Sequence, residues 1–277
     1  MIGPLSRRDR RSFDAAAVVT GAGSGIGRAF ARELARRGGS VVCADIDESA
    51  AKQTVRLIED SGGRAVPVSC DVTEERQVWD LSETAEHWLG RQPGLIVNNA
   101  GIGTGGTHIG DTALSDWRRT LAVNLWGVVH GTHVFTPWLR AMNSGGIINI
   151  ASAAGFAAAP RMGAYNASKA AVVALSETLA AELAGTDVAV TVVCPTFVQT
   201  NILASETIDN AAANLAGKLM RLTGVSPESI ARTSLDANDR GRLYALPQLD
   251  ARLIWRTKRL LPGAYLTAAR LGERLLP

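Results

Sequence analysis

The fold of this 277-residue chain is decided by residues 20–27, which read Thr-Gly-Ala-Gly-Ser-Gly-Ile-Gly. A short apolar run at residues 15–19 comes before this stretch, and residues 28–37 after it carry Phe30 and Leu34 at helical spacing. This order predicts a strand, a tight loop and a helix. Glycines let such a loop approach a pyrophosphate group, whose charge the helix N-terminus attracts. A plain strand-to-helix turn also uses glycine, but the flanking strand and helix favour a dinucleotide site.

The same unit of strand and helix repeats along the chain. Further strands are predicted at residues 40–44, 66–70, 95–97, 146–151 and 188–194, and helices at residues 49–61, 114–142 and 165–183. Strands that alternate with helices imply a parallel sheet covered on both faces. Right-handed crossovers would make it doubly wound. The predicted fold class is therefore α/β, a doubly wound parallel sheet of the Rossmann type in a single domain.

Three segments follow from this pattern. We expect a basic leader at residues 1–14, the Rossmann domain at residues 15–248, and a basic amphipathic extension at residues 249–277. Within the domain, residues 196–225 are expected to form a variable helical lid over the substrate, with helical stretches at residues 200–222 and from Pro227. Residues 242–246 read as a last short strand. The extension is expected to pack against protein, although a basic amphipathic helix also suits an anionic membrane surface.

Composition and charge exclude several classes of protein. Apolar residues make up 46% and charged residues 20% of the chain, which argues against disorder. The net charge of +3 comes from the two ends, so the body offers no basic stripe for nucleic acid. No apolar run reaches the roughly 18 residues of a membrane span. The cysteines, Cys43, Cys70 and Cys194, are odd in number and far apart, which indicates buried thiols and a cytoplasmic location.

Asp45 bears on the choice of cofactor. It ends the second predicted strand, 18 residues after Gly27, where a carboxylate accepts hydrogen bonds from ribose hydroxyls and repels a 2′-phosphate. We therefore expect NAD rather than NADP. A strand-end or helix-capping role, shared with Asp47, is the alternative, and Arg28 and Arg64 stay open as cations for a phosphate.

Tyr165 and Lys169 form the strongest chemical pattern. Residues four apart on a helix share a face, so an ammonium lies beside a phenol and stabilises phenolate. Ser152 follows a predicted strand and is expected at the carboxyl edge of the sheet, where ligands of open α/β folds bind. Asn124 falls within a long apolar helix and needs a buried partner. No metal site is expected, because His130 and His133 have no carboxylate close in sequence.

Taken together, these motifs resemble the short-chain dehydrogenase/reductase family, of its NAD-binding type. The resemblance covers residues 15–200, about two thirds of the chain. It is carried, in the family's order, by residues 20–27, Asp71-Val72, residues 98–101, Asn124, Ser152 and residues 165–169.

The resemblance implies specific roles. Tyr165 would exchange the substrate hydroxyl proton while Ser152 hydrogen-bonds the same oxygen. Lys169 would hold the nicotinamide ribose and lower the pKa of Tyr165, and Asn124 would anchor a water that links Lys169 to solvent. The implied cofactor site consists of Gly21, Ser24, Gly25, Ile26, Asp45, Asp71, Val72, Asn98, Ala100, Gly101, Tyr165, Lys169, Pro195, Val198 and Thr200.

One departure concerns the substrate side. The family usually has Pro-Gly after the strand that ends near Cys194, and here the pair is Pro195-Thr196. The predicted lining is mostly apolar, which suggests a hydrophobic secondary alcohol or ketone such as a steroid, terpenoid, aryl or lipid-derived compound. Its members are Ile102, Gly103, Thr104, Ala153, Ala154, Phe156, Arg161, Met162, Phe197, Ile202, Leu203 and Met220.

The sequence leaves other functions open. An NADPH-linked keto or acyl reductase is disfavoured by Asp45, and a non-catalytic NAD-binding protein is disfavoured by the complete set of Asn124, Ser152, Tyr165 and Lys169. A peripheral membrane adaptor would use the extension. As partners we expect a small alcohol or ketone and a second copy of the chain, in a homodimer or homotetramer formed through the helices that begin near Leu114 and Tyr165.

Overall fold

A computed structural model describes residues 10–199 and 224–274 of the chain. Within these residues the sheet has seven parallel strands in the order β3-β2-β1-β4-β5-β6-β7. The strands are β1 (Ala16–Thr20), β2 (Ser40–Asp45), β3 (Arg64–Ser69), β4 (Leu95–Asn98), β5 (Gly145–Ile150), β6 (Val188–Val193) and β7 (Tyr244–Ala245). The prediction of a doubly wound parallel sheet is confirmed.

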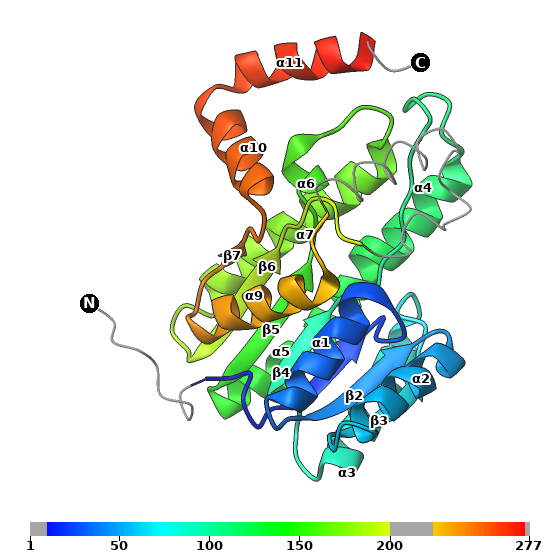
Figure 1. The fold of residues 1–277 in the computed structure, drawn as a ribbon, viewed down its shortest axis with the longest axis vertical. Helices are drawn as coiled ribbons and strands as arrows, with labels where there is room; N and C mark the ends of the chain where they lie inside the picture. The colour runs from blue at the N-terminus through cyan, green and yellow to red at the C-terminus, as the bar shows by residue number, and fades with distance from the viewer. Residues whose placement is uncertain (1–9, 200–223, 275–277) are drawn as a thin grey trace.

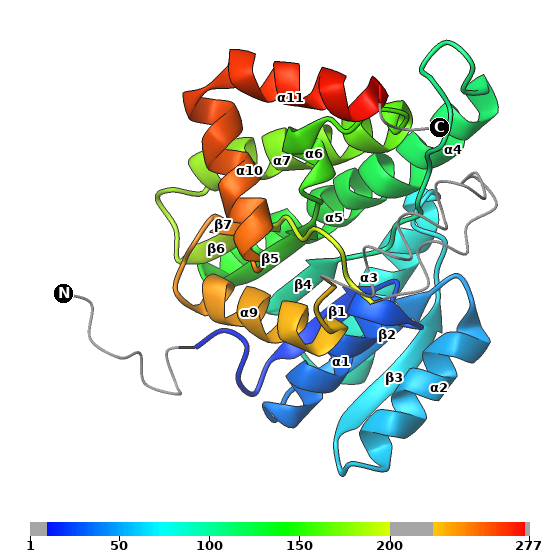
Figure 2. The same ribbon diagram turned by 45° about the horizontal axis from the view of Figure 1, so that its top comes forward.

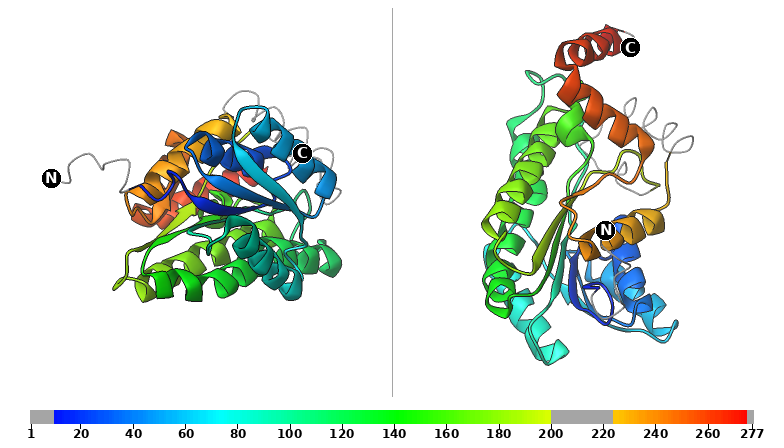
Figure 3. Two further views of the ribbon diagram at one scale, coloured as in Figure 1. Left: turned by 90° about the horizontal axis from the view of Figure 1, so that it is seen from below. Right: turned by 90° about the vertical axis from the view of Figure 1, so that its left-hand side faces the viewer.

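Helices cover both faces of the sheet (Figure 1, and the left view of Figure 3). One face carries α1 (Gly25–Arg36), α2 (Glu48–Glu59) and α9 (Pro227–Asp239). The other carries α3 (Glu75–Leu89), α5 (Gly127–Met142) and α7 (Gly163–Glu182), and α4 (Leu114–Leu121) leads into α5. Because both faces are covered, β1 is buried along its whole length, and its sequence is apolar up to Thr20 rather than alternating.

Two hydrophobic layers hold the helices to the sheet. Phe30 and Leu34 of α1 pack with Ile230 and Leu235 of α9 on one side. On the other side Leu81 of α3 packs with side chains of α5 and α7. The helical face predicted from Phe30 and Leu34 is therefore the buried face of α1.

Two helices differ from the sequence prediction. Helix α3 was not predicted, although Val78, Leu81 and Ala85 are buried at helical spacing and carry the signal. The predicted single helix at residues 114–142 is interrupted by a π-helical turn, Ala122–Trp126. A π-turn inserts an extra residue into the helix and often marks a functional site.

The end of the predicted leader is docked against the domain. Ser12 is buried, and its Oγ donates to Asp239 Oδ2 over 2.7 Å. Arg37, at the end of α1, is buried beside it and donates to Ser12 Oγ, Glu33 and Asp236. One guanidinium thus joins the leader, α1 and α9.

The C-terminal extension forms α10 (Leu249–Leu260) and α11 (Pro262–Arg274), beyond the carboxyl ends of the strands (Figures 1 and 2). Helix α10 packs against the short helix α6 (Ala154–Ala157). Among the helices of residues 10–199 and 224–274, none is both long and apolar enough to cross a membrane. The predicted lid helix at residues 200–222 lies outside the described residues.

We expect the free energy of unfolding to fall by about 3 kcal/mol in Arg37→Met, because the Asp239 carboxylate would stay buried without its cation, while Glu33 would keep only Arg36. A urea titration followed by circular dichroism measures this change. The matched control is Arg36→Met, whose side chain is 68% exposed against 3% for Arg37, and it should cost under about 1 kcal/mol. Equal losses in the two variants would contradict the assignment.

Candidate active site

The candidate site lies where the order of the strands reverses, between β1 and β4. Chain segments leave these two strands in opposite directions, and ligands of open α/β sheets bind in the crevice outside the carboxyl ends at such a point. A cavity of about 1280 Å³ occupies this crevice. Of the predicted cofactor residues, those that line it are Gly21, Ser24, Gly25, Ile26, Asp45, Asp71, Val72, Ala100, Gly101, Tyr165, Lys169, Pro195 and Val198.

The glycine loop is shaped by close backbone contacts. Gly21 has φ of +64°, and a Cβ built on it would lie 2.8 Å from Ala100 Cα. A Cβ on Gly27 would lie 2.0 Å from Gly21 O, so the first turn of α1 passes directly over the loop. Only glycine fits at both positions. The N-terminus of α1 thereby lies at the cavity, where its dipole favours a negatively charged group.

The Asp45 carboxylate lies beside this loop at the end of β2. Asp45 Oδ2 accepts a hydrogen bond from Gly23 N over 2.8 Å, and Oδ1 accepts one from Asp47 N over 3.0 Å. Asp47 instead caps α2 by accepting from Ala50 N. The two aspartates therefore have separate roles, and Asp45 is the one that lines the cavity.

The two cations that the sequence left open both have other partners. Arg28 Nε donates to Thr54 Oγ1 over 3.0 Å, and its Nη2 donates to Gly23 O. Arg64 lies at the opposite end of β3, where its guanidinium covers the Trp88 ring at 4.5 Å. Neither side chain lines the cavity.

Ser152, Tyr165 and Lys169 meet on one wall of the cavity. Ser152 follows β5, and Tyr165 and Lys169 lie one turn apart on α7, where all three are buried. The Tyr165 hydroxyl and Ser152 share a hydrogen bond. Lys169 Nζ donates to Ile150 O over 2.9 Å and lies 5.8 Å from the centroid of the Tyr165 ring. The predicted pairing of phenol and ammonium is thus present, with the serine beside it.

Burial dominates the protonation of this cluster. It raises the pKa of Tyr165 above its ordinary value, and the hydrogen bond with Ser152 opposes that shift only in part. Burial also lowers the pKa of Lys169 to about 8. Lys169 is not among the causes of the Tyr165 shift, so the lowering of the Tyr165 pKa by Lys169 that the resemblance implies stays a prediction.

Asn124 lies behind the cavity wall and is fully buried in the π-helical turn. Its Oδ1 accepts from Ile102 N over 2.8 Å, and its Nδ2 donates to Ile102 O over 2.9 Å and to Ser168 Oγ over 3.3 Å. The buried partner that the sequence required is thus the loop after β4. A Cβ on Gly101, in the same loop, would lie 3.1 Å from Asn124 Oδ1 and 3.5 Å from Lys169 Nζ.

Other predicted residues are placed differently. Asn98 does not line the cavity: it is buried in β4, where its Nδ2 donates to Asn149 Oδ1 over 2.9 Å. Phe156 and Arg161 also lie outside the lining, while Ile102, Gly103, Thr104, Ala153, Ala154, Met162 and Phe197 belong to it. Thr200, Ile202, Leu203 and Met220 lie outside the described residues.

Several residues at the site escaped the sequence analysis. The sequence analysis considered His130 only as a metal ligand and excluded that role. In the structure its Nδ1 lies 2.9 Å from Val72 O, where it fixes the loop that carries Asp71 and Val72. Ile254 and Tyr265 of the extension line the cavity, yet nothing distinguishes them in sequence from other apolar residues there. Across residues 10–199 and 224–274, no three His, Cys, Asp or Glu side chains gather closely enough to hold a metal ion.

Comparison with known proteins identifies the family. A family profile described as short chain dehydrogenase matches residues 15–211, and the chain belongs to this family. A crystal structure of a short chain dehydrogenase/reductase from Burkholderia phymatum in complex with NAD superimposes with a TM-score of 0.83 at 35% identity, covering 90% of this chain and 96% of that one.

Two curated relatives give further context. "Probable oxidoreductase EphD" of Mycobacterium tuberculosis is 36% identical over 93% of this chain, which spans only 45% of that protein's length. The 1-deoxy-11-beta-hydroxypentalenate dehydrogenase of Streptomyces exfoliatus is 34% identical over 89% of this chain and 90% of its own length.

The lowered pKa of Lys169 can be observed directly, since the chain has four lysines. In protein labelled with ¹³C at lysine Cε, one of the four signals should titrate near pH 8, and it should be missing from Lys169→Met. The sign follows from burial, which disfavours the ammonium, so the neutral amine dominates above that pH. A Lys169 signal that stays protonated up to about pH 10, the ordinary range for lysine, would contradict the prediction.

Proposed function

We propose that this chain is an NAD-dependent oxidoreductase that transfers a hydride between NAD(H) and a hydrophobic secondary alcohol or ketone, with Tyr165 as the general acid and base. The observation that carries the proposal is the convergence of Ser152, Tyr165 and Lys169 on one wall of a cavity whose other end reaches Asp45. A protein that only bound a dinucleotide would have no use for this wall.

The preference for NAD rests on Asp45. Its carboxylate suits the two ribose hydroxyls of NAD and would repel the 2′-phosphate of NADP. Arg28 and Arg64, the cations that could have offset this repulsion, are bonded to Thr54 and Gly23 and to Trp88, and neither lines the cavity. The structural relative from Burkholderia phymatum was crystallised with NAD, which supports the same choice.

The side chains of the wall suit proton transfer to a carbonyl oxygen. NAD supplies the hydride chemistry when bound. Ser152 would donate a hydrogen bond to the substrate oxygen, and Tyr165 would deliver a proton to it in ketone reduction or remove one in alcohol oxidation. Tyr165 holds its proton at neutral pH, as an ordinary phenol does, and burial raises its pKa further, so it is ready to act as the acid. Lys169, on the same helix face, would hold the nicotinamide ribose and provide positive charge.

The lining of the cavity favours an apolar substrate. Ile102, Met162 and Phe197 contribute to it from three different loops. The relative from Streptomyces exfoliatus is named as the dehydrogenase of a hydroxypentalenate, which is in keeping with a bulky hydroxylated substrate. Apolar walls gain free energy by removing such a substrate from water.

We also propose that the chain acts as a homodimer or homotetramer in the cytoplasm. Trp126, at the end of the π-helical turn, is 54% exposed, while Val128 next to it is packed into its own subunit. An exposed tryptophan on a helix that covers the sheet suits contact with a second copy. The three thiols, Cys43, Cys70 and Cys194, are free and buried, in keeping with a reducing compartment.

Tyr165→Phe should lower kcat for NAD-dependent alcohol oxidation by about 100-fold or more, because the proton acceptor is lost while the ring stays. The measurement is NADH formation across a panel of hydrophobic secondary alcohols. The dissociation constant for NAD serves as the internal control and should stay within about threefold of the parent protein. If Tyr165→Phe still forms NADH at the rate of the parent protein, the proposed mechanism is wrong.

Asp45→Asn should lower kcat/KM for NAD by about tenfold and raise it for NADP, because a charge-assisted hydrogen bond to the ribose is lost together with the repulsion of phosphate. The comparison is made with one alcohol and both cofactors. Asp47→Asn is the matched control, since Asp47 caps α2 and does not line the cavity. A parent protein that already prefers NADP would show that the role given to Asp45 is wrong.

A further inference from the structure

The C-terminal extension reaches the cavity that holds the catalytic wall. Ile254 of α10 and Tyr265 of α11 line it together with Ser152 and Tyr165. We propose that α10 and α11 form the outer wall of the substrate pocket, and that Ile254 and Tyr265 determine substrate specificity by contacting the apolar part of the substrate. This assignment rests on the function proposed above.

The first anchor of this wall is the loop after β6. Thr196 N donates to Gln248 Oε1 over 3.0 Å, and Gln248 Nε2 donates to Phe197 O over 2.8 Å. Thr196 Oγ1 donates to Asp250 Oδ1, again over 3.0 Å. Gln248 is buried, so its two hydrogen bonds are partly shielded from water, whereas the bond from Thr196 Oγ1 to Asp250 is exposed. The start of α10 is thereby fixed to the loop in which Pro195, Thr196 and Phe197 also line the cavity.

Thr196 connects a departure from the family pattern with the C-terminal extension. It stands where glycine is usual, and its hydroxyl bonds a residue of the extension that lies beyond the last strand. Glycine has no side chain to make this bond. The Thr196 side chain therefore attaches the helix that follows β7 to the loop after β6.

The second anchor lies at the other side of the pocket. Tyr265 Oη donates to Ala157 O over 2.5 Å, at the end of α6. Helix α6 belongs to the connection between Ser152 and Tyr165, so this bond ties α11 to the loop that carries the catalytic serine. Within the extension, Lys258 Nζ lies 5.7 Å from the centroid of the Tyr265 ring and joins α10 to α11. The helix pair thus bridges the loops after β5 and β6.

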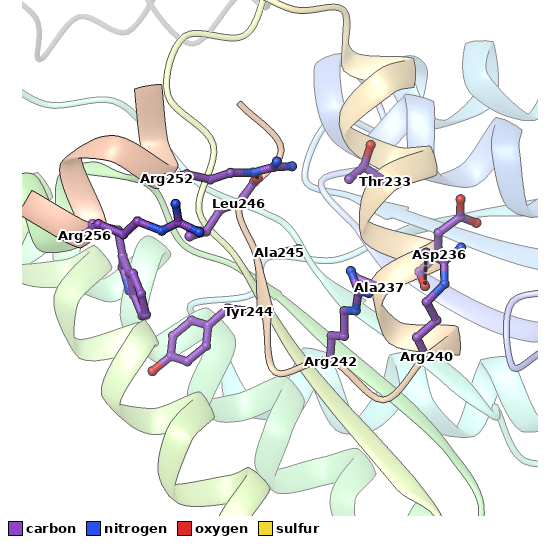
Figure 4. A pocket seen from close by; sticks show the side chains of 11 residues that line it. Thr233, Asp236, Ala237, Arg240, Arg242, Tyr244, Ala245, Leu246, Arg252 and Arg256 are labelled. Carbon is purple, nitrogen blue, oxygen red and sulfur yellow. Dashed lines mark hydrogen bonds between the residues drawn. The ribbon is translucent and has the colours of Figure 1, made fainter. Parts of the chain in front are cut away.

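Other side chains of α10 hold it against the body of the protein. The Arg259 guanidinium lies 4.1 Å from the Trp255 ring and 5.7 Å from the Tyr244 ring. Tyr244 in turn hydrogen-bonds Glu177 of α7. Figure 4 shows Tyr244 with Arg252 and Arg256 beside a separate groove of about 410 Å³, which α10 shares with β7 and α9. The contacts of Arg259 with Tyr244 and Glu177 connect α10 to β7 and α7, so Ile254 is presented to the cavity from a helix attached to the body of the protein.

The proposed wall predicts that the protein selects substrates by the length of their apolar chain. A short alcohol at Ser152 and Tyr165 needs only the nearby loops, whereas a longer apolar chain extends to Ile254 and Tyr265 and loses contact with water there. Such contacts bind the substrate equally well before and during the reaction, so they should act on KM and leave kcat unchanged. This split separates a specificity role from a catalytic one.

The test compares 2-butanol with 2-decanol under NAD-dependent oxidation. In Ile254→Ala and Tyr265→Ala, KM for 2-decanol should rise about tenfold, while kcat for both alcohols and KM for 2-butanol stay within about twofold. Leu253→Ala and Leu266→Ala are matched controls, because these neighbours are exposed and do not line the cavity. Equal KM values for 2-decanol in the wall variants and the controls would overturn the proposal.

The anchor is tested at position 196. Thr196→Val removes the hydroxyl at nearly constant size and should raise KM for 2-decanol as the wall variants do. Thr196→Ser keeps a hydroxyl and should restore the parent value. If valine and serine behave alike, the bond to Asp250 does not position the wall.

A binding measurement separates this proposal from the proposed function. Calorimetric titration of 2-decanone into protein saturated with NAD involves no turnover, because no hydride is available. An affinity that falls about tenfold in Ile254→Ala and Tyr265→Ala, but not in the controls, supports the wall even if no alcohol is oxidised. Absence of 2-decanone binding to the parent protein, or an equal loss of NAD affinity in the wall variants, would overturn it.

Discussion

The site depends on how Thr20 joins the two halves of the sheet. Its Oγ1 accepts hydrogen bonds from Asn99 N over 3.0 Å and Ala100 N over 3.2 Å, and Asn99 Nδ2 donates back to Thr20 O over 2.8 Å. These bonds connect the loops that follow β1 and β4, where the strand order reverses. With the loops joined, the glycine turn stays open toward the cavity, and Gly101 is held between Asn124 and Lys169. A buried backbone needs such partners, so the crevice is fixed by the same hydrogen bonds that stabilise the fold.

The second half of the site keeps polar groups in an apolar setting. Lys169 is buried with its ammonium donating to Ile150 O, and Tyr165 is buried beside Ser152. Removal from water moves the pKa of Lys169 down, toward neutral pH, and moves that of Tyr165 up, so the two values move apart. The protein maintains this arrangement because Asn124 and Ser168 hydrogen-bond the surrounding backbone and hold the loop after β4 against α7.

In this proposal, the loops of the sheet and the C-terminal extension have different roles. The loops after β1, β2 and β4 present the groups suited to a dinucleotide, and the loop after β5 together with α7 presents the groups suited to proton transfer. Helices α10 and α11 add apolar side chains without contributing to either set. Under this proposal, changes at Ile254 or Tyr265 would alter the substrate, while the hydrogen bonds around Thr20 and Lys169 would stay as they are.

The sequence by itself determined the features that depend on near neighbours: the strand and helix alternation, the glycine turn, the placement of Tyr165 and Lys169 on one helix face, and the need of Asn124 for a buried partner. It assigned Asn98 to the cofactor site because Asn98 belongs to the same motif as Gly101, but the side chain of Asn98 points into the core toward Asn149. Only the tertiary structure decided that Arg28 and Arg64 are engaged elsewhere, that residue 12 docks beside Arg37, and that Tyr265 reaches Ala157. These contacts join residues that lie from 24 to 108 positions apart in the sequence. A sequence periodicity of 2 or 3.6 residues does not predict such long-range contacts, because the contacts depend on how whole helices and strands pack on the sheet.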